Sequence, residues 1–244
     1  MSRHIRYGFI AALILYWPSI FLLAHVPKVP LWILRTQMSD KTLHYLGYLL
    51  LIFLWWFSFF PAKRPSLRSW ATWFTIVMMM LYGGCDEWLQ QFTHRTPDIM
   101  DWTADMGGVA TGLIIFSFAG VQLSAMLVAS VVIFVLTSLC KSDPLGFVPV
   151  IDIGFYIGAY GLVSQLWISC LRQWRKWSGA ALLGLSLTFP AMLLVVTLIA
   201  ASARHKIFEP DRLIAAVGGV VAGAIIGMAV HICRTPSDPT EQSS

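Results

Sequence analysis

The feature that most constrains this chain is its series of long apolar runs, each able to cross the roughly 30 Å hydrocarbon core of a membrane. Hydrophobic residues make up 57% of the chain and charged residues 12%, which is more apolar material than a soluble domain buries. A spanning backbone must satisfy its own hydrogen bonds, and the alternation typical of barrel strands is absent. We therefore predict an all-α fold, a helical bundle of a polytopic integral membrane protein with about eight spans. The predicted spans are 7–25, 43–60, 70–92, 102–119, 121–138, 150–170, 178–203 and 211–232.

The charges of the connecting segments predict the orientation. The basic loops 62–68 and 171–176 contain no acid, whereas ten of the twelve acidic residues fall on the opposite side. We therefore expect the N- and C-termini in the cytoplasm and the polar stretch 83–112 at the extracytoplasmic face. The tail 234–244 is polar and is predicted to be disordered. A net charge of +5 fits anchoring to anionic membrane lipids, so no nucleic-acid partner is expected.

An internal repeat is visible when the chain is shifted over itself by 111 residues. ADMGGVATGLII at 104–115 then lies over AAVGGVVAGAII at 215–226, and Trp56 lies over Trp167. Matches gather at polar and glycine positions with one constant shift, which favours a duplicated unit. Both copies would insert with the same orientation if each has four spans.

The predicted domains are a first four-helix unit at 1–119, a diverged second four-helix unit at 120–233, and the tail. At the same shift, His44 becomes Phe155 and Asp86 becomes Thr197. The first unit is therefore expected to carry the polar site.

The second predicted helix begins with SDKTLHYLGY at 39–48. Ser39 or Asp40 can cap its N-terminus, and Lys41, His44 and Tyr48 then share one face. Two interpretations stay open for this face. It is an ordinary interfacial helix start with a snorkelling lysine, or it is part of a polar site, since histidine inside hydrocarbon needs a partner.

The third predicted helix ends in CDEWLQQF, where Asp86, Glu87 and Gln90 project toward a common sector. A frayed helix end in water is one interpretation, but acids inside a membrane normally face protein or a cavity. Arg95 follows in the loop. Its guanidinium suits either a counter-ion for these acids or a ligand of an anionic head group.

The fourth predicted helix carries Asp98, Asp101 and Asp105 on one stripe that continues into Gly108 and Gly112. Glycines at this spacing allow close helix packing. A face that packs closely at the glycines carries the carboxylates inward with it. We therefore expect the ends of the second, third and fourth helices to converge on one polar cluster. Its candidate catalytic residues are His44, Asp86, Glu87, Gln90, Asp101 and Asp105, and its candidate substrate-binding residues are Lys41 and Arg95.

The first unit resembles the VanZ-like family of bacterial membrane proteins, named for a glycopeptide-resistance protein, over residues about 7–118. Asp105 stands where the family usually has asparagine. The resemblance implies a bacterial cell-membrane location, work at the envelope surface, and an effect on glycopeptide antibiotic sensitivity. The residues that carry it are Asp40-Lys41 with His44, Asp86-Glu87 with Gln90, then Arg95, and Asp101 with Asp105 and Gly108.

Two classes of function follow as hypotheses. The first is an enzyme that modifies a membrane lipid or a lipid-linked cell-wall precursor at the outer leaflet. Asp86 or Glu87 would be its general base with His44 as partner, while Arg95 and Lys41 hold an anionic head group. The second is a non-catalytic protein that binds a lipid or a partner and whose polar cluster locks the fold.

The sequence does not identify a cofactor. Asp101 and Asp105 could hold a divalent cation, but no Cys/His metal spacing occurs. Transport is less favoured, because the charges gather at one boundary of the predicted membrane.

Overall fold

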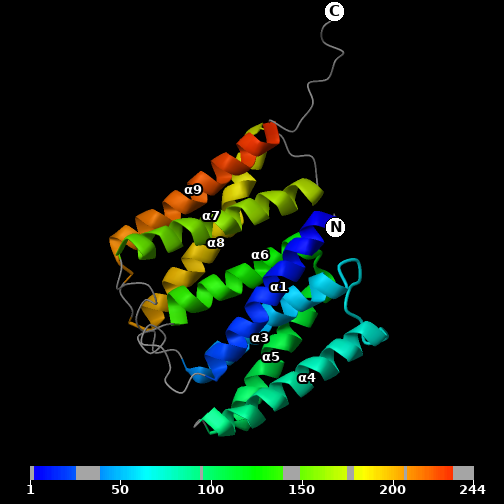
Figure 1. Ribbon diagram of the computed structural model, residues 1–244. Coiled ribbons are helices and arrows are strands. Elements are labelled where there is room, and N and C mark those ends of the chain that lie inside the picture. Colours follow the sequence, from blue (N-terminus) through cyan, green and yellow to red (C-terminus); the bar gives the residue numbers. More distant parts are fainter. Residues whose placement is uncertain are drawn as a thin grey trace, which may run out of the picture. The chain divides into compact units, whose positions relative to one another are not determined.

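The computed structural model describes residues 3–25, 39–93, 96–139, 149–174, 179–205 and 208–232. These residues form helices and no strand, which confirms the all-α prediction (Figure 1). The predicted disordered tail lies outside the described residues. The helices are α1 (Arg3–Ala24), α3 (Asp40–Phe59), α4 (Trp70–Gln90), η1 (Gln91–Thr93), α5 (Ile99–Phe118), α6 (Val121–Phe134), η2 (Val135–Leu139), α7 (Pro149–Trp174), α8 (Gly179–Ala203) and α9 (Pro210–Ile232).

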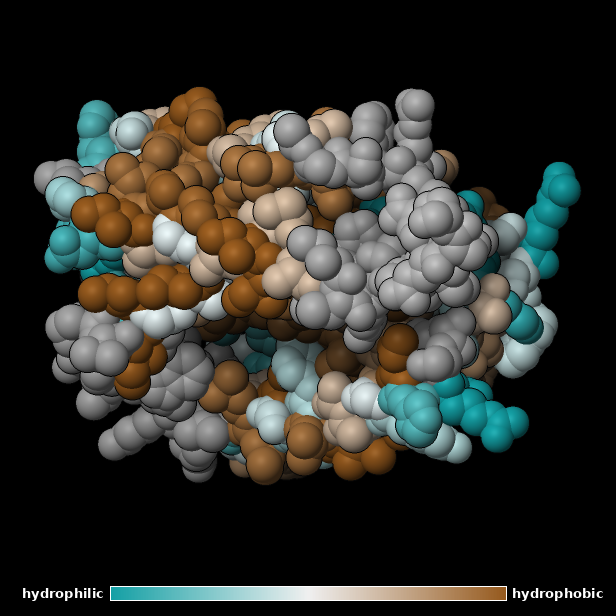
Figure 2. Space-filling view, turned by 90° about the horizontal axis from the view of Figure 1, so that it is seen from above, coloured by the Kyte–Doolittle hydropathy of each residue, from teal (hydrophilic) through white to brown (hydrophobic). Residues whose placement is uncertain are grey.

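Six of the described helices are long and apolar enough to cross a membrane, which supports a multi-pass membrane protein. They are α1, α3, α6 together with η2, α7, α8 and α9. Apolar side chains, shown in brown, cover large parts of the face in Figure 2. The remaining two long helices, α4 and α5, contain the acidic pairs Asp86-Glu87 and Asp101 with Asp105 and are not among these six.

The chain forms two compact units, residues 1–144 and 145–244. The first contains α1 to η2, and the second contains α7, α8 and α9. In the first unit, α6 packs against α3 and α5. By its contacts α6 therefore belongs with the helices that precede it.

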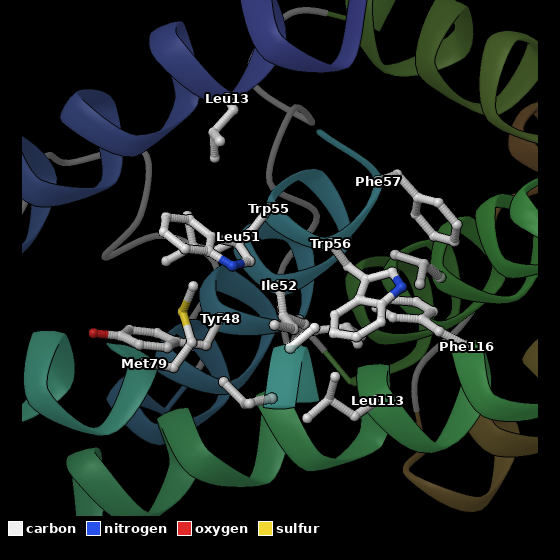
Figure 3. Close-up of a cluster of buried hydrophobic side chains, with 14 residues drawn as sticks. Leu13, Tyr48, Leu51, Ile52, Trp55, Trp56, Phe57, Met79, Leu113 and Phe116 are labelled. Carbon is white, nitrogen blue, oxygen red and sulfur yellow. The ribbon is translucent and has the colours of Figure 1, made fainter. Parts of the chain in front are cut away.

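Helix α3 is the centre of the first unit and packs against α1, α5 and α6. Leu49, Leu51, Ile52 and Trp56 are completely buried. Leu51, Ile52 and Trp56 point in different directions around the helix (Figure 3). An α-helix that buries apolar residues on several sides must be surrounded by other helices. This central position fixes the start of α3, and therefore Lys41 and His44, next to the ends of its neighbours.

Close packing between α3 and α5 depends on glycine. A Cβ atom at Gly108 would clash with the carbonyl oxygen of Tyr45 and lie 2.9 Å from the backbone nitrogen of Leu49. A Cβ atom at Gly112 would lie 2.5 Å from a methyl group of Ile52. Both glycines are therefore packing positions, as the sequence predicts.

The second unit repeats this arrangement with α7 and α9. A Cβ atom at Gly219 would clash with the carbonyl oxygen of Ile157, and one at Gly223 would lie 2.6 Å from that of Gly161. Arg212 Nε donates a hydrogen bond to Asp152 Oδ2 over 2.6 Å between the same two helices.

Replacing Gly108 by alanine should destabilise the fold, because the added methyl group meets backbone that cannot move aside. We expect a loss of about 1–3 kcal/mol in unfolding free energy, the usual range for an overpacked core. Gly107→Ala is the matched control, since its Cβ would meet Tyr45 Cδ2 at an ordinary 3.5 Å. Thermal unfolding in detergent measures both. Equal melting temperatures for the two variants would contradict the close approach.

Candidate functional site

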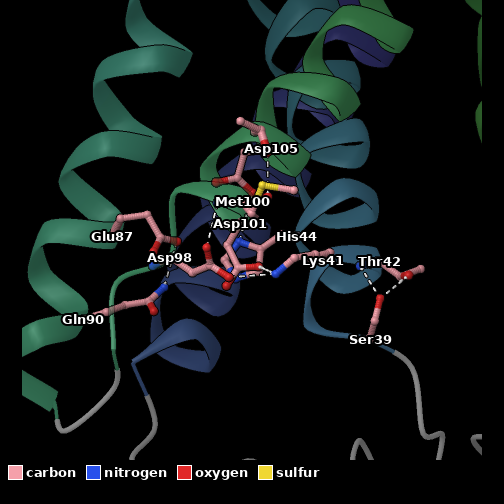
Figure 4. A network of polar contacts seen from close by, with 11 residues as sticks. Ser39, Lys41, Thr42, His44, Glu87, Gln90, Asp98, Met100, Asp101 and Asp105 are labelled. Atoms are coloured by element: carbon pink, nitrogen blue, oxygen red, sulfur yellow. Dashed lines mark hydrogen bonds and ion pairs between the residues drawn. The ribbon is translucent and has the colours of Figure 1, made fainter.

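Three helix ends meet at one polar cluster in the first unit. Lys41 and His44 come from the start of α3, Glu87 and Gln90 from the end of α4, and the aspartates from the start of α5 (Figure 4). Buried carboxylates are stable only with hydrogen-bond partners or counter-charges. The convergence of these three ends agrees with the arrangement expected from the sequence.

Local capping fixes where α3 and α5 begin. The Ser39 side chain accepts a hydrogen bond from the backbone N–H of Thr42 over 3.2 Å, so Ser39 is the N-cap of α3. The Asp98 side chain accepts one from the backbone N–H of Met100 over 2.8 Å and caps α5. Short polar side chains at these positions satisfy backbone donors that the helix leaves unpaired. Each cap therefore also sets the rotation of its helix at the cluster.

Lys41 links the start of α3 to the start of α5. Its Nζ lies 2.7 Å from Asp98 Oδ2 and 3.3 Å from Asp101 Oδ1. The Lys41 hydrogen bond, followed by that from the Met100 backbone, lowers the pKa of Asp98 below its usual value. Lys41, which we predicted as a ligand of an anionic head group, is thus already engaged by two carboxylates.

Glu87 ties the end of α4 to the N-terminus of α5. Its Oε2 accepts a hydrogen bond from the backbone N–H of Asp98 over 3.0 Å, and its Oε1 accepts one from Gln90 Nε2 over 3.3 Å. Glu87 and Gln90 are both buried. Sequence reasoning placed these two side chains in one sector, and the structure does the same.

His44 and Asp105 form the innermost pair of the cluster. His44 Nδ1 lies 3.0 Å from Asp105 Oδ1, and the Asp105 side chain is completely buried. Against an ionised carboxylate, Nδ1–H donates the hydrogen bond, and in the neutral imidazole this leaves Nε2 as an acceptor. A histidine oriented in this way by a buried carboxylate can accept a proton from a substrate.

Two buried polar atoms that lack a hydrogen-bond partner in the described part of the chain lie close to this pair. Within the described residues, Asp105 Oδ2 and the Tyr48 hydroxyl have no hydrogen-bond partner, and both are buried. A Cβ atom at Gly83 would lie 3.3 Å from the Tyr48 hydroxyl and 3.4 Å from Asp105 Oδ2. The absence of a side chain at Gly83 therefore lets α4 approach these two polar atoms closely.

Asp86 faces a different environment from Glu87, although the sequence placed both in one sector. It is buried, and its Oδ1 lies 3.8 Å from Nδ1 of His25, just after the end of α1. His25 Nδ1 itself lies 2.8 Å from the carbonyl oxygen of Phe21. Sequence reasoning missed His25, because it follows α1 and has no helical spacing to the other polar residues.

Asp86 and His44 line a pocket of about 310 Å³ between α1, α3, α4 and the α6–η2 helix. Its other polar groups are Asp40, Tyr48, Tyr82 and Tyr16. Most of the remaining lining is aliphatic, with Ile20, Leu23, Leu43, Leu46, Leu50, Val132 and Leu136. The pocket thus combines an apolar wall with a titratable group at His44 and another at Asp86.

Two sets of side chains could hold a metal ion, and they share His44. One consists of Asp40, His44 and Asp101, and the other of His44, Glu87 and Asp105. Asp101 and Asp105, which the sequence suggested as a pair of ligands, therefore fall into different sets. Arg95, the predicted counter-ion, lies outside the described residues.

The ion pair between Asp98 and Lys41 should make the stability of the fold depend on pH under acidic conditions. Because the pKa of Asp98 is lower in the folded chain, its contribution is complete above the ordinary aspartate pKa, about 4, and is lost as pH falls through the lowered value. Asp98→Asn keeps a capping side chain but loses the charge. We expect the difference in melting temperature between the wild type and this variant to shrink below about pH 4. A difference that stays constant or grows there would contradict the pairing.

Comparisons with family models, with curated proteins and with solved structures find no match to this chain.

Proposed function

We propose that this chain is a VanZ-like protein of the bacterial cell membrane that binds a lipid or lipid-linked envelope precursor at the extracytoplasmic face and modifies its head group. The observation that carries the proposal is the pocket of about 310 Å³ with aliphatic walls and with His44 and Asp86 among its lining residues. This volume is at the lower end of the range for small-molecule sites. A lipid has an apolar part that would suit the aliphatic walls and a polar head group that would suit the side with His44 and Asp86.

The proposed chemistry is general acid–base catalysis on the head group. His44 is held by the buried Asp105 and lines the pocket. Asp86 lines the same pocket and provides a second titratable group. Glu87 already accepts two hydrogen bonds and supports the geometry of the site. Two titratable groups in different environments at one pocket are the usual arrangement for such chemistry.

Arg95 is the proposed main ligand of the anionic head group, and Lys41 contributes less to its binding. The Lys41 ammonium already binds Asp98 and Asp101, so its charge is largely balanced within the cluster. Arginine suits phosphate because its planar guanidinium can donate two parallel hydrogen bonds.

The orientation and the number of spans complete the proposal. Six described helices fit a membrane by length and composition, and α4 and α5 are proposed as the other two spans. With cytoplasmic termini, the start of α3, the end of α4 and the start of α5 share the extracytoplasmic side. The family resemblance favours the same side, because cell-wall precursors are used there.

We also propose that the chain arose by duplication of a four-helix unit, with residues about 120–233 as the diverged copy. The shift of 111 residues carries Lys41 to Asp152 and Asp101 to Arg212, so two interhelical ion pairs occupy equivalent positions with their charges exchanged. It also carries Gly108, which packs against backbone, to Gly219, which does the same. The copy retains the close packing of the α3–α5 pair in α7 and α9, and Phe155 stands in place of His44.

A non-catalytic role is the second candidate, and one observation favours it. Lys41 and Glu87 find their partners inside the cluster and join all three helix ends. Such a network would serve equally as a structural lock that needs no substrate.

Replacement of His44 by glutamine separates the two candidates. If the site is catalytic, we expect His44→Gln to fold with near-normal yield in detergent but to abolish the change in envelope lipids that the wild type causes. The measurements are the folded yield, the lipid composition by mass spectrometry, and the glycopeptide sensitivity of expressing cells.

The matched control is Tyr45→Phe, one residue away, which removes a hydrogen bond of 2.9 Å to Thr111 outside the pocket. This variant should change the lipids as the wild type does. Collapse of the His44→Gln yield favours the lock, and wild-type lipid changes in that variant would exclude catalysis by His44.

A further inference from the structure

We propose that His44, Glu87 and Asp105 form a binding site for one divalent transition-metal ion. One potential ligand atom from each side chain lies within 4.8 Å of the other two. The three residues come from α3, α4 and α5, respectively. Ligands on neighbouring packed helices form a site whose geometry the fold itself sets. This inference stands apart from the proposed acid–base role of His44, because an imidazole nitrogen bound to a metal ion cannot also accept a proton.

The buried carboxylate of Asp105 is the observation that points to a ligand. Its Oδ1 faces His44, whereas its Oδ2 has no partner within the described residues. Asp105 is completely buried, and an unsatisfied buried carboxylate oxygen is costly. A metal ion would satisfy this oxygen.

The direction of Asp105 Oδ2 agrees with this assignment. The oxygen lies 3.4 Å from the position of a Cβ atom at Gly83 of α4. Gly83 and Glu87 are four residues apart and therefore share a face of that helix. Asp105 Oδ2 is thus turned toward the side of α4 that carries Glu87.

Charge balance also favours a cation here. Glu87 and Asp105 are both buried, and within the described part of the chain the cluster forms its lysine or arginine ion pairs with Lys41. Lys41 binds Asp98 and Asp101, so it does not neutralise Glu87 and Asp105 directly. A divalent ion bound by both side chains would add positive charge between them.

The ligand set suits a particular class of metal. An imidazole with two carboxylates is a common set for Zn²⁺ and Mn²⁺, whose bonds to such ligands are about 2.0–2.2 Å long. Neighbouring ligand atoms around one such tetrahedral ion lie about 3.4 Å apart. The three atoms lie within 4.8 Å of one another, so side-chain shifts that close these separations by up to about 1.4 Å would bring them to bonding distance. Glu87 can still bind an ion, because each of its oxygens keeps a lone pair beyond the hydrogen bond it accepts.

The second set, Asp40, His44 and Asp101, fits less well. Asp40 is exposed, and the Asp101 Oδ1 atom lies 3.3 Å from the Lys41 ammonium. An ammonium group at that distance competes with a metal ion for the same oxygen. Both sets contain His44, so Glu87 and Asp105 mark the proposed site, whereas Asp40 and Asp101 mark the second set.

The test loads the purified full-length chain with metal. The protein in detergent is stripped with a chelator, incubated with Zn²⁺ or Mn²⁺, desalted, and its metal content measured by mass spectrometry. We expect one ion per wild-type chain, at least a tenfold loss of affinity in Glu87→Gln, and unchanged binding in the matched control Asp101→Asn. Removal of one ligand typically weakens metal binding to this degree or more.

Two results would overturn the proposal: a wild-type chain that retains no ion, or unchanged binding in Glu87→Gln. If Glu87→Gln does not fold, loss of the ion in Asp101→Asn overturns the proposal instead. Pulsed electron paramagnetic resonance of the Mn²⁺-loaded chain should show nitrogen coupling from one imidazole. Absence of that coupling would exclude His44 as a ligand and contradict the site.

Discussion

The burial of Asp105 beside His44 is the interaction on which the polar cluster depends. A carboxylate with no exposure among apolar helices needs a partner, and the imidazole at 3.0 Å is the one that α3 supplies. That requirement fixes the rotation of α5 against α3. The same rotation brings Asp101 and Asp98 to Lys41 and turns Gly108 toward the α3 backbone. Packing and electrostatics therefore specify one arrangement of the two helices.

The pocket follows from the same arrangement. Helix α3 supplies one side with Leu43, Leu46 and Leu50, while α1 and the α6–η2 helix supply the other. His44 belongs both to this pocket and to the Asp105 pair. A ligand in the pocket would therefore meet an imidazole whose orientation is already set. Preorganised polar groups of this kind support binding or catalysis without a large rearrangement.

Much of the site could be predicted from spacing alone. Helical periodicity placed Glu87 with Gln90, and the glycine spacing predicted which face of α5 is buried. Other contacts depend on tertiary packing and leave no local signal. The partners of Lys41 and the proximity of His25 to Asp86 join residues more than fifty positions apart. The association of α6 with the preceding helices also depends on contacts that a periodic pattern does not specify.

A double-mutant cycle on His44 and Asp105 tests the central contact most directly. The unfolding free energies of the wild type, His44→Gln, Asp105→Asn and the double variant would be measured in detergent. If the two side chains are paired in a buried site, the double variant should differ from the sum of the single variants by about 1–3 kcal/mol. Additive effects, within about 0.5 kcal/mol, would show that the pair does not exist.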